Sequence, residues 1–318
     1  MRMNIEITLD KVSEKFEKIG IPGRDLYDLP ASGKSFDDGC HYRIEMSGLE
    51  GPKVLEAMIK ERRRLGVPVH RIVSFCQGAN WFSDSDLKDF CQMAADDNLE
   101  AVAIPTTRNS IDIGRQALSS DGKGSGFANQ RGSDELRKVV YELYRLYEIG
   151  FRGMMLMDPY AVNVVKRLQD AGEFPKDVVI KLSCWAGISS PAAAYVVEKL
   201  GVGSYNPISD LTLPQLASMR KVGSVPMDFY ITTFDTYGGS NRTLDSAEVT
   251  KLCAPCYLKF EPAPAISFYT PYVFDPTHIE LMNKKLKLAL WVVEHISQNQ
   301  PQIKTSPHGT KGLFLPKV

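Results

Sequence analysis

The sequence predicts one (β/α)8 barrel, a TIM barrel of the α/β class, and three observations support this prediction. Eight short apolar runs recur between about residue 41 and about residue 262. A helical stretch, or a loop that leads to one, follows each run, as in the repeated βαβ units of a parallel sheet. The length of 318 residues also suits such a barrel as a single domain. The runs are His41–Ser47, Arg71–Cys76, Glu100–Thr106, Gly153–Asp158, Val178–Cys184, Ser204–Ile208, Asp228–Phe234 and Tyr257–Glu261.

The segments before and after the eight runs divide the chain into three parts. Residues 1–40 form an N-terminal extension and residues 41–298 form the barrel. Residues 299–318 form a tail with three Pro, two Gly and no periodic pattern. We expect this tail to pack as an extended arm or to mediate contacts in a homo-oligomer.

The first βα unit carries clear helix signals. Leu55, Met58 and Ile59 share one face of the stretch 49–66, with Pro52 suited to its first turn and Gly66 to its end. Units four to eight are compact, and the last helix is expected over 277–297.

The third unit departs from the short connections of the others. Roughly 25 residues separate Thr106 from the helix that begins near Ser133, a length that is uncommon inside a compact domain unless the loop is functional or disordered. The Gly-rich part, Ser119–Gly132, follows a barrel strand and therefore faces the end where TIM barrels place their chemistry. We interpret it as a mobile lid.

Composition and charge exclude several classes of protein. Hydrophobic residues make up 43% of the chain and charged residues 24%, an ordinary balance for a globular protein. The 38 basic and 38 acidic residues cancel, which argues against nucleic acid or an anionic membrane as the main partner. No apolar run reaches the roughly 20 residues that span a bilayer. The first residues lack the apolar core of a signal peptide, so a cytoplasmic protein is expected.

Histidine positions argue against a zinc centre. His41 and His70 begin strands, at the barrel end opposite the expected active site, and the other three lie in the last helix or the tail. No cofactor is certain. A Mg²⁺ or Mn²⁺ site of Glu45, Asp158 and Glu261 stays open, because hard cations prefer oxygen ligands.

The six cysteines are expected to be free thiols, since no secretion signal accompanies them. Cys253 and Cys256 have the spacing of a redox or metal pair and lie near Cys40 at the N-terminal end of the barrel. We interpret all three as structural, because a closed tetrahedral metal site would need a fourth ligand.

Alternation along the strands places charged side chains inside the barrel. In the first strand Ile44 and Met46 face the helices, so the residues between them face the lumen, and the fifth and eighth strands follow the same rule. Burial of isolated charges is costly, which predicts either a pocket for a polar or anionic small molecule or an internal ion-pair network. The residues assigned to the lumen are Arg43, Glu45, Ser47, Lys181, Ser183, Tyr257, Lys259 and Glu261.

Four of these residues are candidates for catalysis. Lys181 is the first choice, because burial pushes a lysine toward the neutral form that acts as a base or a Schiff-base nucleophile. Lys259 is its competitor, and Glu45 and Glu261 would carry protons. The predicted protein is an enzyme that acts on a small polar, carboxylated metabolite by hydrolase chemistry or by carbon–carbon or carbon–heteroatom lyase chemistry.

Polar residues near the strand ends would bind this substrate. Arg43 or Arg108 would hold its carboxylate in bidentate fashion. Trp185 is equally consistent with packing over the fifth strand, and Asp158 with capping the helix that follows it. The candidate substrate-binding residues are Arg43, Arg108, Gln77, Asp158, Trp185, Asn206, Asp235 and Tyr237.

The stretch NPISDLTLPQLASMRKVGSVPMDFY (206–230) resembles the collagenase-like peptidase family of unassigned catalytic type. Ser209-Asp210 and Leu211-Thr212-Leu213 occupy the positions of the family's strand end and helix entry, and 228–239 occupies its next strand. The family's later His-Gly and Cys motif is absent from this region, where Phe234-Asp235-Thr236-Tyr237 stands instead. The resemblance covers about 30 residues, supports the fold and transfers no catalytic residue.

Two other functions stay open beside the metabolic enzyme. The resemblance implies an RNA- or cofactor-modification factor, with a cluster at the three cysteines near the N-terminal end of the barrel. A non-catalytic barrel that serves as a scaffold subunit, with the tail as its docking arm, is the second.

Overall fold

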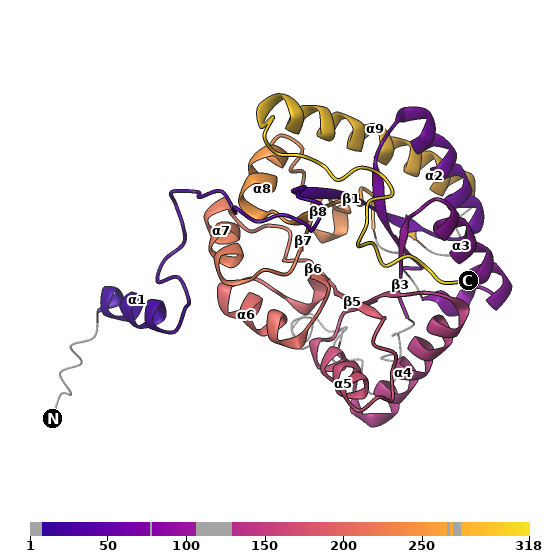
Figure 1. Cartoon of the computed structure of the whole chain (residues 1–318), viewed down its shortest axis with the longest axis horizontal. Helices are drawn as coiled ribbons and strands as arrows, with labels where there is room; N and C mark the ends of the chain where they lie inside the picture. Colours follow the sequence, from indigo (N-terminus) through magenta and orange to yellow (C-terminus); the bar gives the residue numbers. More distant parts are fainter. Residues whose placement is uncertain (1–7, 77, 106–128, 266–267, 270–274) are drawn as a thin grey trace.

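The computed structural model describes residues 8–76, 78–105, 129–265, 268–269 and 275–318. Within these residues eight parallel strands form a closed barrel, in which each strand pairs with the next and β8 pairs with β1 (Figure 1). The (β/α)8 fold predicted from the sequence is confirmed. The strands are β1 (Tyr42–Leu49), β2 (Val69–Ser74), β3 (Glu100–Ala103), β4 (Gly153–Leu156), β5 (Val179–Leu182), β6 (Ser204–Tyr205), β7 (Met227–Thr232) and β8 (Cys256–Phe260).

Helices surround the barrel in the order of the chain (Figure 1). Short 3-10 turns, η1 (Ala79–Trp81), η4 (Cys184–Ala186) and η5 (Asp235–Tyr237), follow three of the strands. The α-helices are α1 (Leu9–Lys18), α2 (Pro52–Leu65), α3 (Asp84–Asp96), α4 (Gly132–Ile149), α5 (Pro159–Asp170), α6 (Pro191–Leu200), α7 (Leu213–Val222), α8 (Ser246–Cys253) and α9 (Asp275–Asn299).

Local sequence signals set the ends of several helices. Pro52 is the first residue of α2, and Gly66 ends it with a φ of 72°, in the left-handed region that glycine adopts without strain. Ser83 caps α3 through reciprocal bonds with Asp86. The positions of Pro52 and Gly66 agree with the predicted first βα unit.

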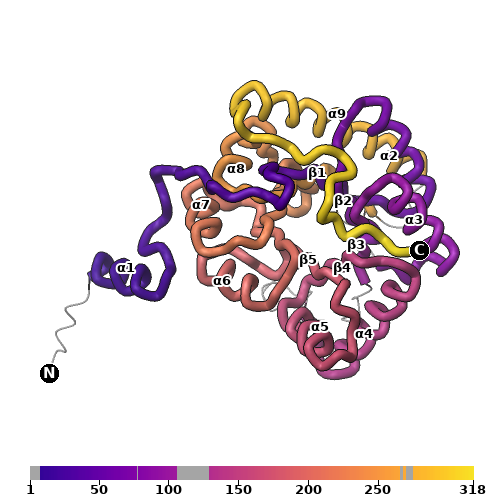
Figure 2. Tube along the Cα trace, viewed as in Figure 1, coloured from indigo at the N-terminus to yellow at the C-terminus, as the bar shows by residue number. Residues whose placement is uncertain are grey.

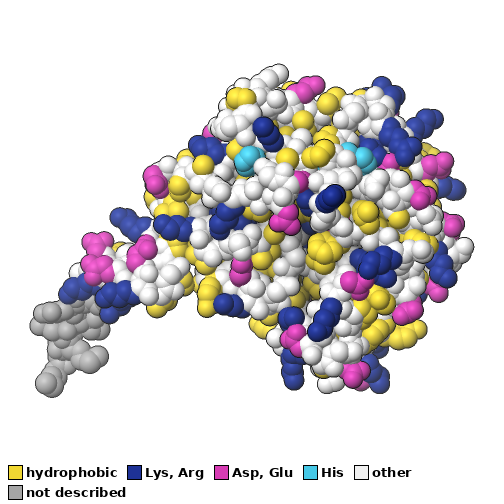
Figure 3. Space-filling view, in the orientation of Figure 1, with side chains coloured by type: hydrophobic (Ala, Val, Ile, Leu, Met, Phe, Trp, Pro, Cys, Tyr) yellow, Lys and Arg dark blue, Asp and Glu magenta, His cyan; other side chains and the backbone are white. Residues whose placement is uncertain are grey.

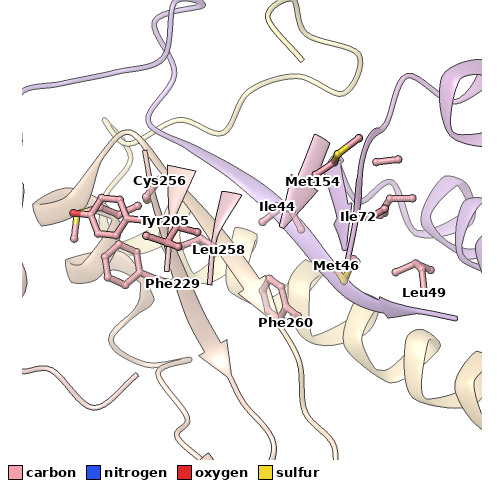
Figure 4. Packing of buried hydrophobic residues seen from close by; sticks show 14 of the residues in the cluster. Ile44, Met46, Leu49, Ile72, Met154, Tyr205, Phe229, Cys256, Leu258 and Phe260 are labelled. Carbon is pink, nitrogen blue, oxygen red and sulfur yellow. The ribbon is translucent and has the colours of Figure 1, made fainter. Parts of the chain in front are cut away.

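The strand residues that face outward form the main apolar core. Ile44 of β1 and Leu258 and Phe260 of β8 are fully buried, and Figure 4 shows them between the strands and the surrounding helices. Ile44 pairs with Leu258 in the sheet, and the next pair along is Glu45 with Lys259. Because side chains alternate along a strand, outward packing of the first pair turns the second pair into the lumen.

The two terminal segments meet the barrel differently. Helix α1 stands apart from the barrel, and none of its residues is buried (Figures 1 and 2). The tail crosses the N-terminal end of the barrel as an extended arm. Ser306 N donates to Tyr42 O at 3.0 Å, and Lys317 N donates to Gly150 O at 2.9 Å.

The surface of the described residues carries mixed charge. On the face shown in Figure 3, Lys and Arg side chains are interspersed with Asp and Glu. Among the helices that the structure describes, none is both long and apolar enough to cross a membrane.

Candidate functional site

A layer of paired charges crosses the middle of the lumen. Arg71 of β2 donates through Nε to Glu45 and through Nη2 to Asp228. Its Nη1 donates to Ser204 Oγ at 3.0 Å. Lys181 Nζ donates to Asp228 and lies 3.2 Å from Glu45 Oε2. All five side chains are buried, so their pairing offsets a large desolvation cost. In this layer the lumen charges form the ion-pair network that the sequence left as one of two alternatives.

Burial and neighbouring charges together lower the pKa values of both Glu45 and Lys181, for different reasons. Burial favours the neutral form of Glu45, but Arg71, Lys181 and Lys259 outweigh it and lower the pKa of this carboxyl. Burial lowers the pKa of Lys181, although Asp228 and Glu45 oppose the change. Glu45 is therefore a fixed anion, and Lys181 is the lumen lysine that loses its proton more easily than usual.

Above this layer, at the C-terminal strand ends, lies a second group of polar side chains. Lys259 Nζ is 3.2 Å from Glu261 Oε2 and 3.8 Å from Glu45 Oε1. Ser47 Oγ donates to Glu261 Oε1 at 2.9 Å, and Lys259 Nζ lies 4.8 Å from the ring centre of Tyr230. Burial disfavours the charge on Lys259, but Glu261 and Glu45 outweigh burial and raise its pKa. Lys259 is therefore a fixed ammonium.

An apolar wall faces these polar groups across the lumen. Val73, Val102, Ile104, Met155 and Phe234 belong to one buried cluster, separate from the main core. The pocket between wall and polar groups, which we call the mouth, has a volume of about 20 Å³. That is room for about one water molecule or one small functional group. The mouth is lined by Ser47, Cys76, Ile104, Met155, Met157, Ser183, Trp185, Tyr230, Phe234, Lys259 and Glu261.

Two further ionisable residues lie beside the mouth. Glu50, just after β1, accepts a hydrogen bond from Cys76 N at 3.0 Å, and burial raises its pKa to about 7. Lys285 of α9 donates to Ser47 O and, at 2.9 Å, to Tyr269 OH. Burial lowers the pKa of Lys285 to about 8. Both groups therefore change charge near neutral pH.

The structure brings the four catalytic candidates together and separates Arg43 from them. Glu45, Lys181, Lys259 and Glu261 form one connected set of ion pairs. Arg43 lies at the other end of the barrel, where its Nε donates to Ser306 Oγ of the tail at 3.2 Å.

Three sequence predictions fall where the structure gives no description. Gln77 and Arg108 lie outside the described residues. The loop Ser119–Gly132, predicted as a lid, lies outside them as far as residue 128. Their proposed roles stay predictions.

The other candidate substrate-binding residues have mostly structural contacts. Asp158 caps α5 by accepting from Tyr160 N at 2.8 Å, which was the alternative interpretation of this residue. Trp185 lines the mouth and packs against its apolar wall. Asn206 is buried and donates to Asp228 O at 2.8 Å. Asp235 and Tyr237 lie in η5, after β7.

Sequence reasoning missed five of the charged residues that lie in or beside the lumen. Arg71, Glu100 and Asp228 each stand first in a predicted apolar run, so the alternation applied to the first, fifth and eighth strands would have found them. Lys285 lies on the buried face of α9, and its helical spacing from the apolar residues of that face was the only sequence signal for it. Glu50 lies in a loop, and no pattern pointed to it.

The cysteines make no cluster with other ligands. Cys253 and Cys256 are buried free thiols, and Cys40 is half-buried and also free. In the described ranges, no group of three or more His, Cys, Asp or Glu side chains is arranged to hold a metal ion.

Comparisons with known proteins leave the family open. No family model and no curated protein matches the chain. Similar solved structures include a U32 peptidase at 18% identity and a TM-score of 0.37, covering 64% of this chain and 74% of that one. A dipeptide epimerase from Methylococcus capsulatus, complexed with Mg ion, has 12% identity and a TM-score of 0.41, covering 83% and 65%. A D-psicose 3-epimerase from Clostridium cellulolyticum H10 has 10% identity and a TM-score of 0.44, and the match covers 79% of this chain and 96% of that one.

At these identities and TM-scores the likenesses carry no argument about family, activity or substrate. The barrel itself is established by the pairing of its strands. The resemblance of residues 206–230 to the collagenase-like peptidases stays a prediction.

Proposed function

We propose that this protein is an enzyme that acts on a small polar, carboxylated metabolite at the mouth, by hydrolase or lyase chemistry. The observation that carries the proposal is Lys259, an ammonium with 1% of its surface exposed, held between Glu261 and Glu45 at the C-terminal strand ends. Active sites of (β/α)8 enzymes lie at this end of the barrel.

Lys259 and Glu261 take different roles in this proposal. A fixed ammonium in a desolvated pocket stabilises negative charge that develops on a carbonyl or carboxylate oxygen. Glu261 is oriented by Ser47 and moves the proton, to or from a water molecule or a substrate carbon. Because the mouth has room for about one functional group, it would take the reacting group of the substrate and leave the carbon skeleton at its opening.

A Schiff base on either lysine is the less favoured chemistry. A Schiff base forms from a neutral amine, but Glu261 and Glu45 raise the pKa of Lys259 and so keep it protonated. Lys181 loses its proton more easily, but its Nζ is engaged by Asp228, and it lines a cavity at the N-terminal end instead of the mouth. Borohydride reduction with candidate carbonyl substrates, followed by peptide mapping, should label neither residue. A labelled Lys259 or Lys181 would restore the Schiff-base mechanism.

A metabolite screen by thermal shift tests the binding proposal. Carboxylated compounds should selectively stabilise the wild type and the control Lys284→Gln, whose lysine is exposed on α9. Lys259→Gln should lose that stabilisation, and Lys259→Arg should retain part of it because the charge remains. If no carboxylated compound stabilises the wild type, or if Lys259→Gln binds as well, the proposal is wrong.

Once a substrate is known, two measurements separate the chemistries. Glu261→Gln should lower kcat by roughly a hundredfold or more with a smaller change in KM, as expected for loss of a general acid–base group. Reaction in ¹⁸O-labelled water should place the label in the product of a hydrolase and leave the products of an elimination unlabelled.

A further inference from the structure

A larger cavity opens at the opposite end of the lumen. It has a volume of about 290 Å³, near the lower end of the roughly 300–1,000 Å³ of small-molecule pockets. Arg43, Arg71, Lys181, Glu100 and Tyr257 line it from inside the barrel. Segments from both termini complete its wall, with Ser35, Phe36 and Asp37 from the extension and Gly312 and Phe314 from the tail. We call it the N-terminal cavity.

The guanidinium groups in this cavity are already engaged by the protein. The three nitrogens of Arg71 donate to Glu45, Ser204 and Asp228. Those of Arg43 donate to Ser306 Oγ at 3.2 Å, to Tyr257 OH at 3.3 Å and to Lys311 O at 3.3 Å.

The lysine of the cavity is engaged in the same way. Lys181 Nζ donates to Asp228 and lies 3.2 Å from Glu45. An incoming anion would therefore have to compete with carboxylates that already neutralise these cations.

Glu100, unlike these cations, has only long contacts with its partners. Its side chain is 3% exposed, and it accepts one hydrogen bond at 3.3 Å, from Tyr257 OH. Among the described residues its nearest cationic nitrogen is Arg71 Nη1, at 3.7 Å. Burial raises the pKa of Glu100, with Arg71 opposing the change. This ion pair is longer than those that Glu45 and Asp228 make with the same guanidinium. A cation closer to Glu100 would therefore recover part of the free energy that its burial costs.

We propose that the N-terminal cavity binds a small organic amine, whose ammonium group pairs with Glu100 and whose carbon skeleton lies against Phe36 and Phe314. Asp37 at the wall adds a second negative charge. The Arg43 guanidinium already lies 4.0 Å from the ring centre of Phe36, so the exposed ring of Phe314 is the one that would attract the organic cation. This site is separate from the mouth, so it stands whether or not the proposed enzyme activity is correct.

Phenethylamine is a suitable probe, because it joins an ammonium group to an aromatic ring. Its matched comparisons are 3-phenylpropionate, of similar shape and opposite charge, and the neutral 2-phenylethanol. Isothermal titration of the wild-type protein should show binding of phenethylamine at least tenfold tighter than of either comparison. Equal or tighter binding of 3-phenylpropionate, or no binding of phenethylamine, would overturn the proposal without any variant that has to fold.

Two variants then place the bound amine. Glu100→Gln keeps the shape of the side chain and removes its charge, and it should weaken phenethylamine at least tenfold, the range expected for loss of a charged hydrogen bond. Trp185→Phe alters the mouth and should leave phenethylamine binding unchanged. Loss of binding in Trp185→Phe together with retention in Glu100→Gln would put the amine in the mouth and overturn the proposal.

Discussion

The two ends of the barrel differ in how much space they enclose and in how freely their charges change. The mouth encloses about 20 Å³ beside Glu50 and Lys285, whose pKa values of about 7 and about 8 lie near neutrality. The N-terminal cavity encloses about 290 Å³. At the same end of the barrel, burial acts to raise the pKa of Asp38, but hydrogen bonds from Thr310 and Ser306 outweigh it and bring the pKa to about 2. Burial lowers the pKa of His70, near the start of β2, to about 3.

This difference separates a place suited to proton transfer from a place suited to binding. A small pocket with groups that titrate near the working pH favours acid–base chemistry. A larger cavity, at the end of the barrel where Asp38 and His70 are fixed in one state, favours recognition of a ligand. Arg71 lies between the two ends and pairs with Glu45, Asp228 and Glu100.

The largest effect is expected at the centre. Arg71→Met removes the cation that pairs with Glu45, Asp228 and Glu100 and leaves only Lys181 between the first two, so the variant should lose about 3–5 kcal/mol of unfolding free energy. Urea denaturation measures this loss. Arg64→Met, which removes an exposed guanidinium paired with Glu61, is the control and should behave like the wild type. A stable Arg71→Met would mean that the two ends are not linked through one charge network.

At the mouth, Glu50 should make stability depend on pH. Its pKa is about 7 in the folded protein, against an ordinary value of 4.5, so the folded state retains a proton that the unfolded state loses. This contribution to stability is fully present below pH 4.5 and is lost as the pH rises through 7. The difference corresponds to about 3 kcal/mol.

Glu50→Gln carries no ionisable proton and tests this expectation. The variant should equal the wild type near pH 4.5 and exceed its unfolding free energy by about 2–3 kcal/mol at pH 8. Urea titrations at the two pH values measure both points. Glu61→Gln, at a half-buried carboxyl paired with the exposed Arg64, should show no such gain at pH 8. Parallel pH profiles for Glu50→Gln and the wild type would contradict the prediction.

The smallest global effect is expected at the N-terminal cavity. Arg43 holds the tail through Ser306 and Lys311, so Arg43→Met should release the tail at a cost of about 1–2 kcal/mol. Hydrogen exchange in residues 305–318 should become faster, while the mouth keeps its protection. Lys317→Met removes an exposed pair with Asp177 and should change stability by less than about 0.5 kcal/mol. Equal exchange in Arg43→Met and the wild type would show that the arginine does not anchor the tail.

The sequence alone determined the barrel and much of its charged lumen. Strand and helix periods follow from backbone geometry, so eight apolar runs sufficed to predict the eight strands. The same alternation placed Glu45, Lys181, Lys259 and Glu261 inside, where the structure pairs them. The same alternation, applied to the second and seventh strands, would also have placed Arg71 and Asp228 inside.

Tertiary structure alone decided at which end of the barrel each residue lies and which groups it contacts. Arg43 and Lys259 both point into the lumen, yet one meets the tail and the other the mouth, because height along the barrel axis depends on how neighbouring strands are staggered. Glu50 and Lys285 acquire shifted pKa values through burial by segments distant in the sequence. The N-terminal cavity is walled by an extension and a tail without periodic pattern, so only their packing created it.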